Sequence, residues 1–339
     1  MTTPWSAALG GHYWTLRPFL LEHRPGAGRT LAALRSEPWS LQVADAKLGS
    51  VRLTGRLFLP ERADRLLLAI HGLGGSAESS YLRSAVLDAH AAGLACLCLN
   101  LRGADGLGDD FYHAALSSDL HAALASPELA RFRELHVLGF SLGGHLALRH
   151  ATEAHDPRVL SVAAICSPLD LQRSQIALDA PERWVYRHYV LRKLKASYVA
   201  AARQRPMPSP VEQVLRARTI LRWDELTVVP RFGFGSAREY YQQASVAPRL
   251  GSLAVPALLV LAEHDPMVPA HSVRPALAGA SGLLDVRWHT RGGHVGFPAD
   301  IDLGERAPLG LPSQVRSWLA THSRRDSTPA RQAETAGIL

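Results

Sequence analysis

Short apolar runs alternate along the chain with longer segments in which apolar residues recur at helical spacing. The apolar runs lie at residues 66–70, 94–99, 136–140, 159–166, 257–261 and 284–288, and the helical segments at 78–92, 117–125, 142–153 and 312–320. Short runs that alternate with helices are typical of a mostly parallel sheet with helices on both faces. The pattern therefore predicts an α/β fold of this kind.

A long segment separates the apolar run that ends at Cys166 from the one that begins at Ala257. We predict that residues 168–250 form an inserted helical cap, with a proline-rich loop at 205–210 between two helical stretches. Residues 1–322 would then make one domain, and 47% hydrophobic content is enough for a sizeable core. Residues 323–339 are rich in Arg, Ser, Thr and Ala without apolar periodicity, so we expect a disordered tail.

The sequence Gly139-Phe140-Ser141-Leu142-Gly143 lies where a predicted strand turns into a predicted helix. A serine on such a turn takes a strained backbone conformation that exposes its hydroxyl group, and flanking glycines relieve the crowding. A tight turn with no chemical role is the alternative interpretation. We predict that Ser141 is a nucleophile.

A serine nucleophile needs a base and a group that orients the base. Asp265 follows the apolar run at 257–261, and His294 lies in the glycine-flanked loop Arg291-Gly292-Gly293-His294-Val295-Gly296. We predict that His294 is the base and Asp265 the orienting acid, with Glu263 as the competing acid. The chain order Ser, Asp, His is the one found in α/β-hydrolases.

A glycine-rich segment, His71-Gly72-Leu73-Gly74-Gly75-Ser76, follows the apolar run at 66–70. A turn of this kind can direct backbone N–H groups toward a developing negative charge. We predict that the N–H groups of Leu73 and Leu142 form an oxyanion hole. A phosphate-binding loop is the competing interpretation, but the Walker lysine and the dinucleotide glycine spacing are both missing.

These motifs together resemble the YheT-like branch of the α/β-hydrolases, over roughly residues 10–320. The resemblance rests on His71-Gly72-Leu73-Gly74-Gly75-Ser76, Arg102-Gly103, Tyr112-His113, Asp119-Leu120, Gly139-Phe140-Ser141-Leu142-Gly143-Gly144, Asp265-Pro266 and Gly292-Gly293-His294-Val295-Gly296-Phe297. It implies an α/β-hydrolase fold and a carboxylesterase or lipase activity with Ser141, Asp265 and His294 as the triad. The chain departs from the branch in having His12-Tyr13-Trp14-Thr15 for His-Leu-Gln-Thr, and Ala104 and Ala115 for the common Cys and Gly.

The expected reaction is two-step acyl transfer on a small-molecule or lipid ester, by an acyl-enzyme mechanism. A short-chain carboxylesterase and an acylglycerol lipase both fit this expectation. An acyltransferase would use the same triad with an alcohol in place of water. A binding protein that keeps the fold without activity is the non-enzyme alternative.

Basic residues outnumber acidic ones by 37 to 30, a formal net charge of +7. Residues 183–205 contain seven Arg and Lys residues and no acid, interleaved with aromatic and leucine residues. This segment could contact an anionic membrane surface or an acidic substrate, but a solvated helix face is the interpretation we favour. No nucleic-acid recognition motif accompanies the charge, so we expect no nucleic-acid partner.

The three cysteines, Cys96, Cys98 and Cys166, are odd in number and lie in or at the end of apolar runs. They are expected to be small core residues rather than a disulfide framework. The histidines show no metal-ligand spacing, so we expect no metal and no cofactor. No apolar run approaches the roughly 20 residues of a membrane-spanning helix, and a cytoplasmic location is expected.

Overall fold

The computed structural model describes residues 4–22, 29–107, 109–153 and 156–323. In these parts of the chain, eight strands form one sheet in the order β1-β2-β4-β3-β5-β6-β7-β8. Strand β2 pairs antiparallel with both β1 and β4, and the other neighbours pair in parallel. The strands are β1 (Ser36–Asp45), β2 (Gly49–Phe58), β3 (Arg65–Ile70), β4 (Ala95–Asn100), β5 (Glu134–Phe140), β6 (Val159–Ile165), β7 (Ala257–Ala262) and β8 (Leu284–His289).

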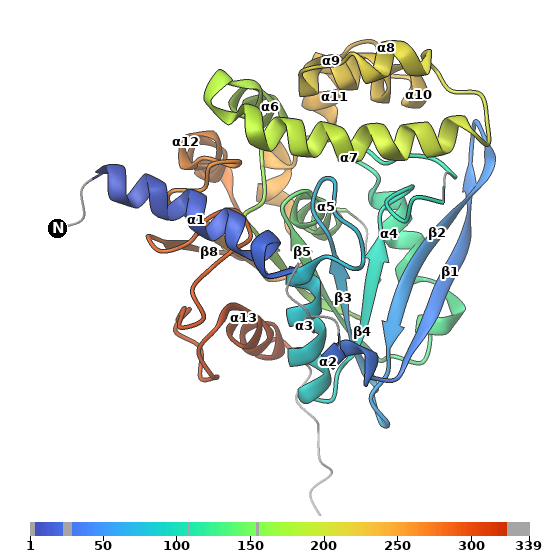
Figure 1. Ribbon diagram of the computed structural model, residues 1–339. Helices are drawn as coiled ribbons and strands as arrows, with labels where there is room; N and C mark the ends of the chain where they lie inside the picture. Colours follow the sequence, from blue (N-terminus) through green and yellow to red (C-terminus); the bar gives the residue numbers. More distant parts are fainter. Residues whose placement is uncertain (1–3, 23–28, 108, 154–155, 324–339) are drawn as a thin grey trace, which may run out of the picture.

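Helices cover both faces of this sheet, which confirms the predicted mostly parallel α/β architecture (Figure 1). Helices α3 (Ser80–Ala91) and α13 (Leu311–Ala320) bury Leu82 and Val315 in the core cluster on one face. Helices α4 (Ser117–Leu124) and α5 (Leu142–Ala151) bury Leu120 and Leu146 in the cluster on the other face. All seven residues of β5 are buried, as expected of a parallel strand with both faces covered.

Six helices between β6 and β7 lie above the sheet in Figure 1, within residues 168–250, where the sequence predicts a cap. Tyr186, Leu194, Tyr198 and Trp223 are buried and form part of its apolar interior. The proline-rich loop predicted at 205–210 falls between two cap helices. The cap helices are α6 (Leu171–Asp179), α7 (Trp184–Ala202), α8 (Val211–Leu215), α9 (Ile220–Leu226), α10 (Val228–Phe232) and α11 (Ala237–Ala244).

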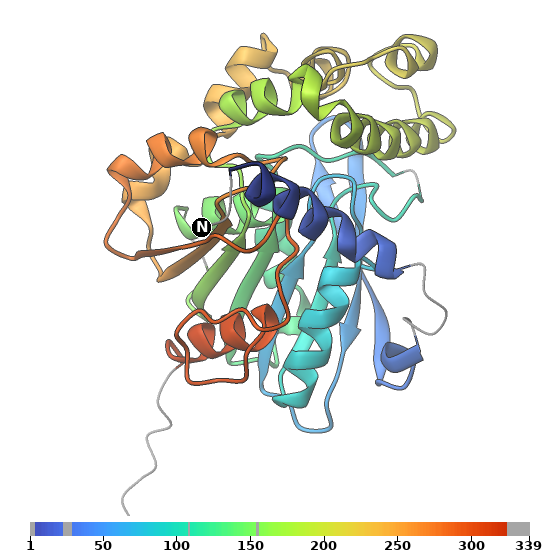
Figure 2. The same cartoon turned by 60° about the vertical axis from the view of Figure 1, so that its left-hand side comes forward.

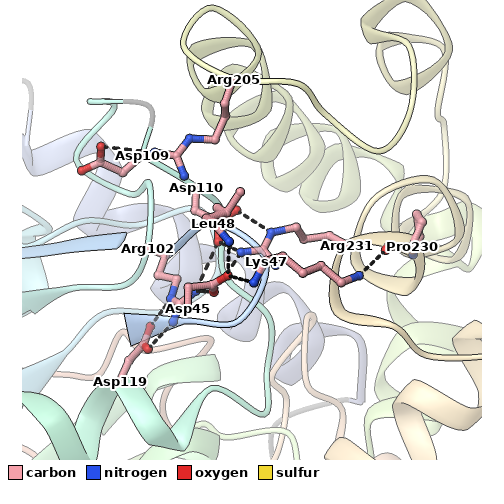
Figure 3. A network of polar contacts seen from close by, with 10 residues as sticks. All are labelled: Asp45, Lys47, Leu48, Arg102, Asp109, Asp110, Asp119, Arg205, Pro230 and Arg231. Atoms are coloured by element: carbon pink, nitrogen blue, oxygen red, sulfur yellow. Dashed lines mark hydrogen bonds and ion pairs between the residues drawn. The ribbon is translucent and has the colours of Figure 1, made fainter. Parts of the chain in front are cut away.

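A buried network of charged side chains joins the cap to the core (Figure 3). Arg102 binds Asp119 through two hydrogen bonds of 2.6 and 2.7 Å, and also contacts Asp45 and Asp110. Arg231 of α10 reaches Asp110 at 2.7 Å and Asp45 at 2.9 Å. Burial by itself would raise the pKa of Asp45, but its hydrogen bonds with Arg102, Arg231 and the backbone N–H groups of Lys47 and Leu48 together outweigh burial and lower the pKa. The β1–β2 hairpin, the loop after β4 and the cap therefore share one set of ion pairs.

The N-terminal helix α1 (Pro4–Glu22) is an element that the apolar pattern does not predict. It lies across the segment that follows β8, close to the start of the cap (Figure 2). Helix α1 also contacts the turn after β7, and this contact requires glycine, because a Cβ at Gly11 would lie 1.9 Å from the carbonyl oxygen of His264. The remaining short elements are α2 (Arg29–Ala32), α12 (Ala270–Val273) and the 3₁₀ turns Pro127–Leu129, Pro181–Arg183, Ala247–Ser252 and Arg274–Gly279.

Cys96, Cys98 and Cys166 are buried and carry free thiols, in line with the predicted core role. Ser323 is still part of the folded structure, with its hydroxyl 3.3 Å from Nε2 of His136. The rest of the predicted tail, residues 324–339, lies outside the described residues. Within the described part of the chain, none of the helices combines the length and the apolar character needed to cross a membrane.

Candidate active site

Ser141 stands at the junction of β5 and α5 with φ 52° and ψ −117°, a conformation that residues with a side chain rarely adopt. The turn leaves no room for side chains at the neighbouring glycines. A Cβ at Gly139 would lie 2.2 Å from the carbonyl oxygen of Gly143, and one at Gly143 would lie 2.4 Å from that of Ile70. The strand, turn and helix thus have the geometry of a nucleophile elbow.

The structure brings Ser141, His294 and Asp265 together from segments far apart in the sequence. Oγ of Ser141 lies 2.9 Å from Nε2 of His294, and Nδ1 of the same ring lies 2.9 Å from Oδ2 of Asp265. All three side chains are buried. A serine hydroxyl that donates to Nε2 leaves the ring proton on Nδ1, where it is donated to the carboxylate.

Backbone and side-chain groups hold the acid and the histidine in place. Oδ1 of Asp265 accepts hydrogen bonds from the backbone N–H groups of Met267 and Val268, at 2.8 and 2.9 Å. The backbone N–H of His294 donates to Oγ1 of Thr15, 2.8 Å away on helix α1, and Thr15 donates to the carbonyl of Gly11. Sequence reasoning missed Thr15, which it noted only as part of a segment that departs from the related branch.

Glu263, the competing acid, is engaged elsewhere. Its two carboxylate oxygens lie 2.7 and 2.6 Å from the guanidinium of Arg274, in an exposed ion pair. The structure therefore places Asp265, and not Glu263, against His294.

Leu73 and Leu142, the residues predicted to form the oxyanion hole, both line one cavity with Ser141 and His294. The neighbours of Leu73 have their amides occupied: Gly72 donates to the hydroxyl of Tyr81 and Gly74 to that of Tyr112. Leu142 is the first residue of α5, where N–H groups have no partner within the helix. The oxyanion hole at these two N–H groups stays a prediction.

The cavity that contains Ser141 and His294 has a volume of about 110 Å³ and lies between the core and the cap. Its walls are mainly apolar, with leucines from both sides, and five cap helices, α6, α7, α9, α10 and α11, contribute to it. A larger groove of about 460 Å³ lies between α1, α3 and α13. That groove is lined by Phe140 and Val295 but not by Ser141 or His294, so the smaller cavity is the one that reaches the reactive atoms.

Three other buried histidines bind the backbone rather than the serine. His71 lies 2.8 Å from the carbonyl of Gly72 and accepts from the N–H of Leu101, and burial lowers its pKa to about 4. His113 accepts from the N–H of Ala115, and burial lowers its pKa to about 3. The ring of His145 bridges two carbonyl oxygens at 2.8 and 2.9 Å. Each of these three rings is thus engaged by backbone groups and not by Ser141.

The family model of the alpha/beta hydrolase fold matches residues 65–290, which is more than half of the chain. The chain therefore belongs to the α/β-hydrolase family. Within it, the chain is YheT-like: it is 29% identical over 264 residues to the Escherichia coli protein named "Putative esterase YheT", and the match covers 76% of each chain.

More distant relatives carry related names. The mouse protein "Phospholipase ABHD3" is 27% identical over 68% of this chain, which spans only 58% of that protein. The yeast "Monoacylglycerol lipase" is 25% identical over 70% of this chain. Among solved structures, the Pyrococcus furiosus esterase Pf2001 superposes with a TM-score of 0.51 at 16% identity, covering 79% of this chain and 87% of its own. That likeness shows a shared fold.

Proposed function

We propose that the chain is a serine hydrolase that cleaves carboxylic esters. The observation that carries the proposal is the hydrogen-bonded series Ser141, His294, Asp265 on a strained nucleophile elbow. Relatives that are named esterase, phospholipase and lipase support the same class of reaction.

In the proposed first step, His294 accepts the Ser141 proton as Oγ attacks the ester carbonyl carbon. Asp265 stabilises the imidazolium that forms, and the N–H groups of Leu73 and Leu142 donate to the oxyanion of the tetrahedral intermediate. The imidazolium then gives its proton to the leaving alcohol. In the second step His294 activates a water molecule, which releases the acyl group as a carboxylic acid.

The size of the catalytic cavity favours a short-chain carboxylesterase over an acylglycerol lipase. Its volume of about 110 Å³ is well below the roughly 300–1,000 Å³ of pockets that enclose drug-sized ligands. A long acyl chain would have to displace cap residues such as Leu178 and Leu194, which are buried in the apolar core. We therefore propose an acyl group of a few carbons as the natural one.

Some cations of the basic segment, residues 183–205, bind backbone carbonyls instead of being simply solvated. Arg183 donates to the carbonyls of Ala177 and Pro266, and Arg187 to those of Leu178 and Ala180 at the end of α6. Nζ of Lys195 donates to the carbonyls of Leu215 and Ala217. Three of the seven cations thus hold cap segments together. Contact with an anionic membrane stays a prediction, with Arg192 and Lys193 as its exposed candidates.

A panel of p-nitrophenyl esters of increasing acyl length tests the proposal. We expect kcat/KM to be highest for acetate to butyrate and to fall for longer chains, since these exceed the cavity. Ser141→Ala should remove nearly all turnover, whereas Ser197→Ala, on α7 and outside the cavity, should retain it. Turnover by Ser141→Ala close to wild type would refute the proposed nucleophile.

A further inference from the structure

The cap side of the catalytic cavity carries polar groups that the proposed reaction does not use. Asp224 of α9, Ser174 of α6 and Tyr241 of α11 all line this cavity together with Ser141 and His294. The three helices pack against one another, so these side chains come from a single wall. The rest of the lining is largely apolar, which makes such a group of polar residues stand out.

Asp224 is a carboxyl group that is only 6% exposed. Its Oδ2 accepts a hydrogen bond of 2.7 Å from the hydroxyl of Tyr241. A carboxyl group can make several hydrogen bonds, and one tyrosine leaves most of that capacity unused. Burial raises the pKa of Asp224 to about 7, so both the accepting and the donating form are present near neutral pH.

Ser174 gives a second, independent observation. Its Oγ is buried and has no hydrogen-bond partner among the described residues. Buried hydroxyl groups nearly always have a partner, because leaving one without a hydrogen bond costs free energy that water would otherwise supply. An unpartnered hydroxyl in the wall of a catalytic cavity therefore points to a polar group that enters with the substrate.

We propose that Asp224 and Ser174 bind a hydroxyl group of the ester, so that the enzyme prefers hydroxylated short-chain esters to their alkyl counterparts. The inference rests on the proposed function and specifies its substrate class. A hydroxyl group fits because it both donates and accepts, which suits a carboxyl group in either protonation state and a serine hydroxyl. The small cavity requires that this group lie within a few carbons of the scissile carbonyl.

A purely structural role is the competing explanation for Asp224, since its bond to Tyr241 links α9 to α11. That role accounts for one carboxylate oxygen. It does not account for Ser174, which lies on a third helix and takes no part in that bond.

Two pairs of esters test the inference and separate the possible positions of the hydroxyl group. The acyl pair is p-nitrophenyl butyrate and p-nitrophenyl 3-hydroxybutyrate; the alcohol pair is ethyl butyrate and 2-hydroxyethyl butyrate, followed by titration of the released acid. We expect a ratio of kcat/KM values of about ten in favour of the hydroxylated member of one pair, the discrimination that one or two buried hydrogen bonds provide.

Ser174→Ala and Asp224→Leu should each bring that ratio toward one. Glu225→Leu, the exposed neighbour on α9, is the matched control and should keep the wild-type ratio. If Asp224→Leu does not fold, Ser174→Ala still tests the inference, because alanine is tolerated well inside a helix. The pair of esters that shows the preference then tells whether Asp224 and Ser174 bind the acyl part or the alcohol part of the substrate.

Equal kcat/KM values within both pairs, with butyrate esters still hydrolysed, would overturn the inference while leaving the proposed function intact. A preference that persists in both cavity variants would overturn it as well. Failure of the wild type to hydrolyse any of these esters would instead count against the proposed function itself.

Discussion

At the scale of single residues, backbone strain collects around the candidate triad. Among the described residues, three that are not glycine have positive φ: Ser141 at 52°, Cys166 at 50° and Val295 at 53°. Val295 follows the histidine, and the thiol of Cys166 lies 3.5 Å from the carbonyl of Gly293. Conformations of this kind persist only where the surrounding structure enforces them, and they concentrate at functional sites.

The role of Asp265 can be tested by a change that keeps its shape. Asp265→Asn removes the charge that fixes the tautomer of His294 and stabilises its imidazolium form. In well-studied serine proteases such a change lowers turnover about ten-thousand-fold, and we expect a loss of this order in kcat. Glu263→Gln is the matched control, because its partner is the exposed Arg274. A larger loss in Glu263→Gln than in Asp265→Asn would reassign the acid.

At the scale of elements, the sequence predicts those strands and helices whose own pattern is strong. Strands β3 to β7 are mostly apolar because both of their faces are covered, and the predicted ends of β3 to β8 lie within two residues of those observed. Strands β1 and β2 lie outside the predicted apolar runs. Pro38 inside β1 disfavours a strand, and it is tolerated because β1 is an edge strand.

Helix α1 could not be predicted from local pattern. It contains Gly10, Gly11 and Pro18, residues that each disfavour a helix interior. Its position depends instead on close packing, such as that of Gly11 against the backbone of His264. The roles of Thr15 and Asp224 could not be predicted for the same reason. Only the fold brings Thr15 to His294 and Asp224 to the cavity at Ser141.

The buried ion network should make the attachment of the cap sensitive to Asp110. Asp110→Ala would leave Arg231 and Arg102 buried with one carboxylate fewer. We expect the free energy of unfolding, measured by urea denaturation, to fall by about 3–5 kcal/mol. Asp109→Ala, which removes a more exposed partner of Arg52, should cost about 1 kcal/mol or less. Similar losses in both variants would show that the network does not stabilise the fold.

At the scale of the whole molecule, buried neutral histidines make stability depend on pH. Burial lowers the pKa of His71 and His136 to about 4 and that of His113 to about 3, from an ordinary value of 6.5. The unfolded chain therefore takes up protons below pH 6.5 that the folded chain does not bind, and stability falls as the pH falls. Asp224 acts in the opposite direction, because its raised pKa stabilises the folded state at low pH.

The destabilising contribution of the three histidines at low pH is larger than the stabilising contribution of Asp224. The free energy of unfolding should therefore fall by a few kcal/mol between pH 7 and pH 5. Urea denaturation at the two pH values measures it. His136→Asn, in β5, should show a smaller loss, since one titrating group is gone. A wild-type protein that is more stable at pH 5 than at pH 7 would contradict this account of the buried histidines.

The most direct test of the central claim is covalent labelling with a fluorophosphonate, which reacts with activated serines. The account predicts one adduct per chain, located by peptide mass spectrometry on the peptide that contains Ser141, and no adduct in Ser141→Ala or after prior unfolding. An unlabelled folded wild-type chain, or an adduct on another serine, would contradict the assignment of Ser141 as the nucleophile.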